Sequence, residues 1–203
     1  MSSSKTIAIV DYGVGNLNSV KKAFDHLGVD VVVTTEPEAI ATAAKIILPG
    51  VGHFSALSGL DNTGLREAVL RAANAGTPLL GICLGMQWLF DGSDEAPEFA
   101  GAGILPGRCR PFPASVKSPH VGWNSLAVLS STRLLRGVAP DSFVYYTHSF
   151  QAPVVAATSA TTEYGQPFSA VVEQENIFGV QFHPEKSSDV GLRILRNFCE
   201  SAL

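Results

Sequence analysis

The residues that decide the fold are Pro78-Leu79-Leu80-Gly81-Ile82-Cys83-Leu84-Gly85-Met86-Gln87. A short apolar run ends at a cysteine between two glycines, and apolar residues at helical spacing follow it. This pattern predicts a strand, a sharp turn and a helix, with Cys83 at the turn. It is a G-x-nucleophile-x-G elbow with cysteine in the place of serine. A thiol at a helix N-terminus is favoured as the thiolate, and the N–H of Leu84 is a candidate oxyanion donor. The alternative interpretation is a buried structural cysteine at the end of a core strand.

A second motif, far along the chain, supplies a candidate base. Residues 177–182 predict another apolar strand, and His183-Pro184-Glu185 follows it directly. In an extended segment the side chains at i and i+2 share a side, so Glu185 is expected to orient His183. We therefore predict Cys83, His183 and Glu185 as nucleophile, base and orienting carboxylate.

The rest of the pattern predicts an α/β fold. Apolar runs at 6–10, 29–34 and 46–48 predict strands, and apolar stripes predict helices at 16–27 and 65–76. This alternation is typical of a doubly wound, mostly parallel sheet, whose functional loops lie at the carboxyl ends of its strands. Later runs suggest antiparallel additions to the sheet in the C-terminal half; they lie at 125–129, 143–147, 153–157 and 168–173. Ser187 and Ser188 are expected to cap a final helix.

Two loops near the predicted elbow are candidates for substrate contacts. Pro49-Gly50-Val51-Gly52 ends the third strand, and its glycines allow backbone N–H groups to face a ligand. Alone it would be an ordinary glycine turn, but beside a nucleophile it is a candidate second oxyanion donor. The acidic stretch 91–97 is either a solvated loop or the source of a carboxylate that meets an α-ammonium group. His53 is interpreted as structural, because His183 already supplies a base.

A glycine pattern near the N-terminus has a rival interpretation. Residues 13–18 resemble the start of a G-x-G-x-x-G dinucleotide motif, but the third position is Asn18. A tight turn with Asn16 near the helix cap fits better.

Size and composition narrow the class of protein. The 203 residues, 46% of them hydrophobic, are enough for a single domain over residues 1–203. A net charge of −4 without a basic block disfavours nucleic-acid binding, and no apolar run approaches a membrane span. The N-terminus does not read as a signal peptide. Three cysteines without a C-x-x-C pair predict a reduced, cytoplasmic protein with no metal site, in which Cys109 and Cys199 are inert.

The ordered motifs resemble those of one enzyme family. Pro49-Gly50-Val51-Gly52, the Cys83 elbow and His183-Pro184-Glu185 together resemble a class I glutamine amidotransferase domain, and the resemblance covers essentially the whole chain. It implies a flavodoxin-like fold and hydrolysis of L-glutamine to glutamate and ammonia without a cofactor. It places the oxyanion donors at Gly50, Val51 and Leu84. It assigns glutamine binding to five residues, namely Gly52, Gln87, Glu95, Ser149 and Phe150.

A narrower resemblance rests on Pro119-His120-Val121-Gly122-Trp123-Asn124. This loop, with 11–16 and Lys186-Ser187-Ser188, is similar to the glutaminase subunits of imidazole glycerol phosphate synthases. The resemblance implies a (β/α)₈-barrel cyclase as partner in a heterodimer, in a step of histidine biosynthesis. Trp123 is a candidate hot spot for that partner, and its expected companions are Asn16, Tyr145 and Lys186.

Three other functions are compatible with parts of the pattern. One is a glutaminase subunit of another amidotransferase, such as the one that feeds pyridoxal phosphate synthesis. The second is a cysteine hydrolase or peptidase of the same fold. The third is a binding module without activity, against which the intact Cys83, His183 and Glu185 argue.

Overall fold

The apolar run before Cys83 forms β4 (Leu79–Cys83), which lies inside an eight-stranded sheet. The computed structural model describes residues 6–13 and 16–201. The parallel strands on one side of β4 are β3 (Lys45–Gly50), β1 (Ile7–Val10) and β2 (Val31–Thr34). On its other side β13 (Ile177–Val180) also pairs parallel with β4, so the strands that precede Cys83 and His183 are neighbours.

The sheet continues beyond β13 with antiparallel strands, as predicted for the C-terminal half. They are β12 (Pro167–Gln174), β11 (Thr158–Glu163) and β8 (Ala127–Val128). The predicted strand at 153–157 is wrong, because that apolar segment is a loop and the strand begins at Thr158. Pro153 lacks an N–H for a ladder, and the N–H of Val155 is taken by the Thr158 hydroxyl at 2.9 Å.

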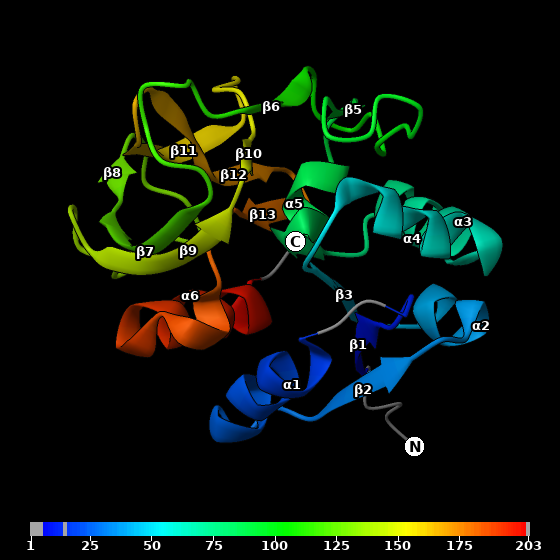
Figure 1. The fold of residues 1–203 in the computed structure, drawn as a ribbon. Coiled ribbons are helices and arrows are strands. Elements are labelled where there is room, and N and C mark those ends of the chain that lie inside the picture. Colours follow the sequence, from blue (N-terminus) through cyan, green and yellow to red (C-terminus); the bar gives the residue numbers. More distant parts are fainter. Residues whose placement is uncertain (1–5, 14–15, 202–203) are drawn as a thin grey trace.

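Helices cover both faces of the sheet (Figure 1). One face is covered by α1 (Leu17–His26) and α6 (Ser188–Glu200). The other is covered by α2 (Pro37–Ala41), α3 (Ser58–Asn62), α4 (Leu65–Asn74) and α5 (Leu84–Trp88). The sequence patterns predicted α1, α4, α5 and α6 but missed the short helices α2 and α3, of which α2 lies in the crossover between β2 and β3. The two apolar cores meet the sheet from opposite sides, since Ile7 and Ile9 contribute to one and Ala8 and Val10 to the other.

Two smaller sheets stand beside the large one. The first contains β10 (Phe150–Gln151), β6 (Arg108–Pro111) and β5 (Gly92–Ser93). The second is a two-stranded ribbon of β7 (His120–Ser125) and β9 (Phe143–His148), so the strand predicted at 143–147 forms but does not join the large sheet. The motif at 119–124, expected as a loop, is therefore mostly a strand, because every residue from His120 to Ser125 pairs with β9. Two 3₁₀ turns complete the fold, η1 (Phe54–Leu57) and η2 (Pro184–Lys186).

In the part of the chain that the structure describes, no helix is long and apolar enough to cross a bilayer. In that same part, no group of three or more histidine, cysteine or acidic side chains is placed to hold a metal ion.

Candidate active site

Cys83 lies at the predicted elbow, between the end of β4 and the first residue of α5. Its backbone has a φ of 53°, in the left-handed region that non-glycine residues rarely occupy. The flanking glycines permit this turn. A Cβ on Gly81 would come within 2.6 Å of the Gly85 carbonyl oxygen, and a Cβ on Gly85 would overlap the carbonyl oxygen of Leu48. Strand and helix therefore pass closely only because both positions lack a side chain.

His183 and Glu185 reach the same edge of the sheet, because β13 runs parallel to β4. The Nδ1 of His183 lies 2.8 Å from Oε1 of Glu185, and both side chains are almost completely buried. The predicted extended conformation is wrong in detail. Glu185 lies in the 3₁₀ turn η2, and this turn still brings its carboxylate to the imidazole. Asn16 joins this pair, because its side-chain amide donates a hydrogen bond to Glu185 Oε1 at 2.7 Å.

The electrostatics of His183 follow from this arrangement. Burial alone would lower its pKa, but the adjacent Cys83 and Glu185 outweigh burial and raise the pKa above its ordinary value. His183 Nε2 is buried, and the Cys83 side chain lies close enough to interact with the imidazole and raise its pKa. The arrangement favours the protonated imidazole of His183 beside the candidate nucleophile.

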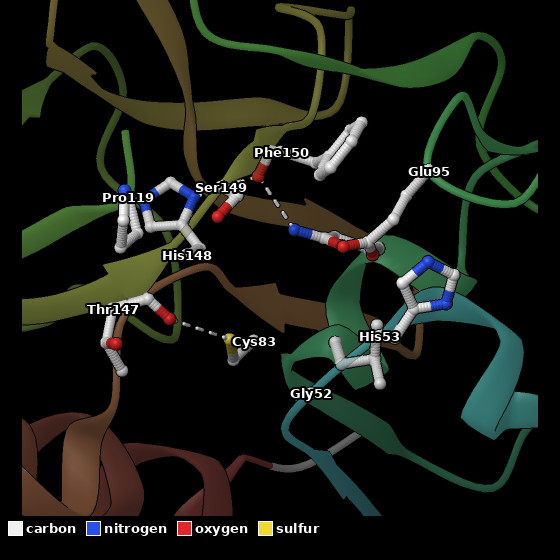
Figure 2. Close-up of a pocket in the computed structure, with 11 residues that line it drawn as sticks. Gly52, His53, Cys83, Glu95, Pro119, Thr147, His148, Ser149 and Phe150 are labelled. Carbon is white, nitrogen blue, oxygen red and sulfur yellow. Dashed lines mark hydrogen bonds between the residues drawn. The ribbon is translucent and has the colours of Figure 1, made fainter. Parts of the chain in front are cut away.

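A pocket of about 320 Å³ opens directly above Cys83. Figure 2 shows its walls, which come from the loop after β3, from α5, from the 91–97 loop and from the β9–β10 segment. All five residues assigned to glutamine binding line it, together with Cys83 and Leu84; the five are Gly52, Gln87, Glu95, Ser149 and Phe150. Residues from four separate regions of the sequence thus converge on one cavity.

Glu95 and Gln87 have different environments in this pocket. Glu95 Oε2 accepts a hydrogen bond from the N–H of Phe54 at 2.8 Å, which fixes the carboxylate against the wall. Gln87 is buried, and its amide nitrogen donates to the carbonyl oxygen of Phe150 at 2.8 Å. Glu95 is therefore suited to contact a ligand, whereas Gln87 already holds the opposite wall.

The glycine loop lies beside the elbow. Gly50 pairs with Cys83 across β3 and β4, and a Cβ at this position would meet the Leu84 side chain and overlap the Tyr12 hydroxyl. Among the described residues, Gly52 and Leu84 line the pocket and Gly50 and Val51 do not. The loop is thus in place beside the nucleophile. Its role as an oxyanion donor stays a prediction.

Sequence reasoning missed several residues of this region. Thr147, His148 and Pro119 line the pocket, and His53, interpreted as structural, also lines it while its Nδ1 accepts from the Ser55 N–H. Gln181 is fully buried, and its amide donates to the Cys83 sulfur at 3.8 Å. The one available signal for Gln181 was its polar side chain inside an otherwise apolar run.

The predicted partner residues divide into two groups. Trp123 and Tyr145 are cross-strand neighbours with ring centroids 6.0 Å apart, and Lys186 Nζ lies 6.0 Å from the Tyr145 ring. Trp123 is 51% exposed, as a docking residue would be. Asn16 instead turns to Glu185. It occupies the N-cap position of α1, but its side chain makes no capping bond. Residues 14–15 of the tight turn predicted before α1 lie outside the described residues.

The start of α6 also differs from the expected cap. Ser187 occupies the N-cap position, as predicted, but its side chain makes no capping hydrogen bond, and Ser188 is the first residue of the helix. Ser187 donates its hydroxyl to the carbonyl oxygen of His183 at 2.6 Å and accepts from the N–H of Tyr145 at 3.0 Å. It therefore ties the histidine to the ribbon.

Known proteins match the whole of this chain. The family model for glutamine amidotransferase class-I matches residues 8–202. The imidazole glycerol phosphate synthase subunit HisH of Moorella thermoacetica is 46% identical over 97% of this chain and 95% of its own length. The subunit of the same name from Methanothermobacter thermautotrophicus is 45% identical over 96% of this chain and 98% of its own.

Solved structures share the fold at low sequence identity. A glutamine amidotransferase crystal structure superposes with a TM-score of 0.76 at 20% identity, covering 95% of this chain and 97% of its own. PurLQS from Thermotoga maritima gives a TM-score of 0.75 at 20% identity, covering 96% of this chain and 98% of its own.

Proposed function

The chain belongs to the class I glutamine amidotransferase family, and from this premise we propose that it is the glutaminase subunit of an imidazole glycerol phosphate synthase. In this proposal Cys83, His183 and Glu185 hydrolyse L-glutamine to glutamate and ammonia. The observation that carries it is that Cys83 lines an open pocket, while His183 and Glu185, hydrogen-bonded to each other, follow the neighbouring parallel strand at the same sheet edge. The identity to HisH subunits supports the choice of synthase over other amidotransferases.

The first half of the reaction transfers an acyl group to sulfur. The Cys83 thiolate attacks the side-chain amide carbon of glutamine, and the new oxyanion is bound by the N–H of Leu84 and the Gly50–Val51 peptide. His183 gives its proton to the departing nitrogen, so ammonia leaves and a thioester remains. Glu185 holds the imidazole in place and stabilises its protonated form.

The second half regenerates the enzyme. His183, now neutral, takes a proton from water as the oxygen attacks the thioester carbon. The tetrahedral intermediate collapses to glutamate and the Cys83 thiolate, with His183 protonated again. In this proposal the α-ammonium group of the substrate is bound by Glu95, which lines the pocket and accepts a hydrogen bond from the Phe54 N–H.

A partner subunit is part of the proposal. The ribbon face, defined as Val121, Trp123, Phe143 and Tyr145, is the outer side of β7 and β9, where strand alternation puts these residues together. Three of them are large apolar side chains that are more than half exposed. We assign this face to a (β/α)₈-barrel cyclase subunit in a cytoplasmic heterodimer. The cyclase uses the ammonia directly, with a phosphorylated ribulosyl precursor, to form imidazole glycerol phosphate, which makes the complex a lyase.

The test uses the complex with its cyclase. Cys83→Ala should abolish synthesis from glutamine and leave synthesis from added ammonium salt intact. A glutamine-like electrophile should label Cys83 alone. Cys109 is fully buried, and burial raises the pKa of the Cys199 thiol to about 11. Cys199→Ala is the matched control and should behave as the parent. Loss of both activities in folded Cys83→Ala would overturn the purely glutaminase role.

A further inference from the structure

The inner side of the β7–β9 ribbon carries a buried polar row that the proposed reaction does not use. His120 and Asn124 alternate with the residues of the ribbon face on β7, and His148 does so on β9. His120 and His148 are 4% and 7% exposed. Two buried histidines whose ring nitrogens are in contact can hydrogen-bond only if one of those nitrogens is protonated and the other is not. The neighbouring acceptor groups determine which nitrogen carries the proton.

The proton positions follow from one carbonyl group. His148 Nδ1 lies 2.9 Å from the carbonyl oxygen of Phe150, which can only accept, so Nδ1 carries the proton. In a neutral imidazole the other nitrogen, Nε2, is then an acceptor. His120 Nδ1 lies 3.2 Å from it and must donate. The Nε2 of His120 is in turn the acceptor for the amide of Asn124, at 3.4 Å.

The surroundings keep both rings neutral and fixed. Burial lowers the pKa of His120 to about 4 and that of His148 to about 3. The His120 ring is stacked between Tyr146 and Tyr164, with centroid distances of 4.8 Å and 4.0 Å. The tautomers and the ring planes therefore have one arrangement that satisfies all the hydrogen bonds.

The row continues into the glutamine pocket. The Phe150 carbonyl that accepts from His148 also accepts from the Gln87 amide, at 2.8 Å. The same amide nitrogen lies 3.2 Å from Oε1 of Gln181, and the Gln181 nitrogen donates to the Cys83 sulfur. In Figure 2, His148 and Phe150 lie on the same pocket wall, opposite Gly52 and His53.

We propose that Asn124, His120 and His148 form a positioning relay for the glutamine pocket. This relay fixes the Phe150 carbonyl and thereby the amides of Gln87 and Gln181, so that the inner side of the ribbon sets the geometry of the pocket wall behind Cys83. Hydrogen bonds run from Asn124 to the pocket wall, and Asn124 is joined to the ribbon face through the backbone of its neighbour Trp123. The proposal rests on the proposed glutaminase function. None of the three relay residues exchanges a proton with the substrate.

The first test measures kcat and KM for glutamine in the complex with the cyclase. His120→Leu removes the donor to His148 and should raise KM roughly tenfold, the effect of one or two lost hydrogen bonds, with a smaller change in kcat. His120→Asn keeps an N–H near the position of Nδ1 and should recover most of the loss. Tyr164→Phe is the matched control, because it keeps the stacked ring and removes only a hydroxyl that bonds to Lys117.

The second test is a double-mutant cycle. His120 and Gln87 belong to one relay, so His120→Leu with Gln87→Met should cost less than the product of the two single effects on kcat/KM. If His120→Leu does not fold, Asn124→Ala, at a partly exposed position, should raise KM in the same direction. An unchanged KM in the folded variants, or fully multiplicative effects, would overturn the relay and leave the glutaminase function standing. A parent complex without glutaminase activity would instead overturn the proposed function.

Discussion

Asn16 and Glu185 are joined by a 2.7 Å hydrogen bond that crosses almost the whole length of the sequence. The Asn16 amide donates to the same carboxylate oxygen that holds His183. A residue at the start of α1 therefore orients the carboxylate of the proposed triad. Because Glu185 Oε2 has no hydrogen-bond partner among the described residues, this contact is a main restraint on the carboxylate.

We predict that Asn16→Leu lowers the glutaminase kcat of the complex roughly tenfold or more, the usual effect of losing a hydrogen bond to a charged group. Asn16→Asp should be worse, since it places a second carboxylate beside Glu185. The affinity for the cyclase is measured separately, by titration. A weaker affinity with an unchanged kcat at saturating cyclase would contradict the orienting role and leave only the predicted interface role of Asn16.

Glu185→Gln keeps the shape of the side chain and removes its charge. The imidazolium of His183 then loses its stabilising partner, and by analogy with other triads glutamine turnover should fall by as much as roughly 10⁴-fold. Synthesis from ammonium salt should persist. Glu67→Gln removes the charge of an exposed ion pair with Arg71. It is the control and should leave glutamine turnover unchanged. Equal turnover in Glu185→Gln and the parent would exclude a catalytic role for the carboxylate.

The buried histidines predict a loss of stability in mild acid. His148 has a folded pKa of about 3 against 6.5 in the unfolded chain, so below pH 6.5 the unfolded state binds more protons and is favoured. At pH 5 this costs about 2 kcal/mol of the free energy of unfolding. His183 acts in the opposite direction between pH 7 and pH 6.5, and it does so equally in the parent and in a His148 variant. Its pKa is raised, so its contribution is complete below pH 6.5 and is lost only at higher pH.

Urea unfolding at pH 7 and pH 5 measures this effect. His148→Asn should show a smaller difference between the two pH values than the parent. His26→Asn, at an exposed position at the end of α1, should show the full difference. If the parent and His148→Asn lose the same stability, the buried histidine is not the cause.

Trp123→Ala should weaken binding of the cyclase by about 30-fold or more, the usual effect of losing an aromatic hot spot. The half-exposed ring leaves no core cavity when it is truncated, so the melting temperature of the free subunit should change little. Leu129→Ala removes an equally exposed apolar side chain away from the ribbon and is the matched control. A large drop in melting temperature with normal binding would identify Trp123 as a core residue.

The features that could be predicted from the sequence were those determined by residues close to one another in the chain. The Cys83 elbow was predicted because two glycines and an apolar strand specify it within a few residues. Glu185 was paired with His183 for a reason that proved incomplete, since a 3₁₀ turn rather than an extended segment brings them together. The bond from Asn16 had no local signal, because it depends on how α1 and β13 are placed by the whole sheet.

The same limit applies to the C-terminal half of the chain. The apolar texture of 153–157 predicted a strand, while the true strand β11 is rich in serine and threonine. The hydroxyls of Thr158 and Ser169 satisfy each other at 2.6 Å inside the core, so a polar segment can be buried. His120 and His148 lie 28 positions apart, and only the register of β7 with β9 reveals that they are partners.

The central place of β13 has a consequence for how the enzyme is made. It is the last strand in sequence among the described residues, yet it lies between β4 and β12. While the ribosome is still adding the final segment, β4 has an open edge and Cys83 has no base beside it. A nascent or prematurely terminated chain is therefore a poor source of ammonia and a good target for aggregation or proteolysis. The proposed site is complete only when β13 is paired with both neighbours, so a chain that lacks this strand is not expected to consume glutamine.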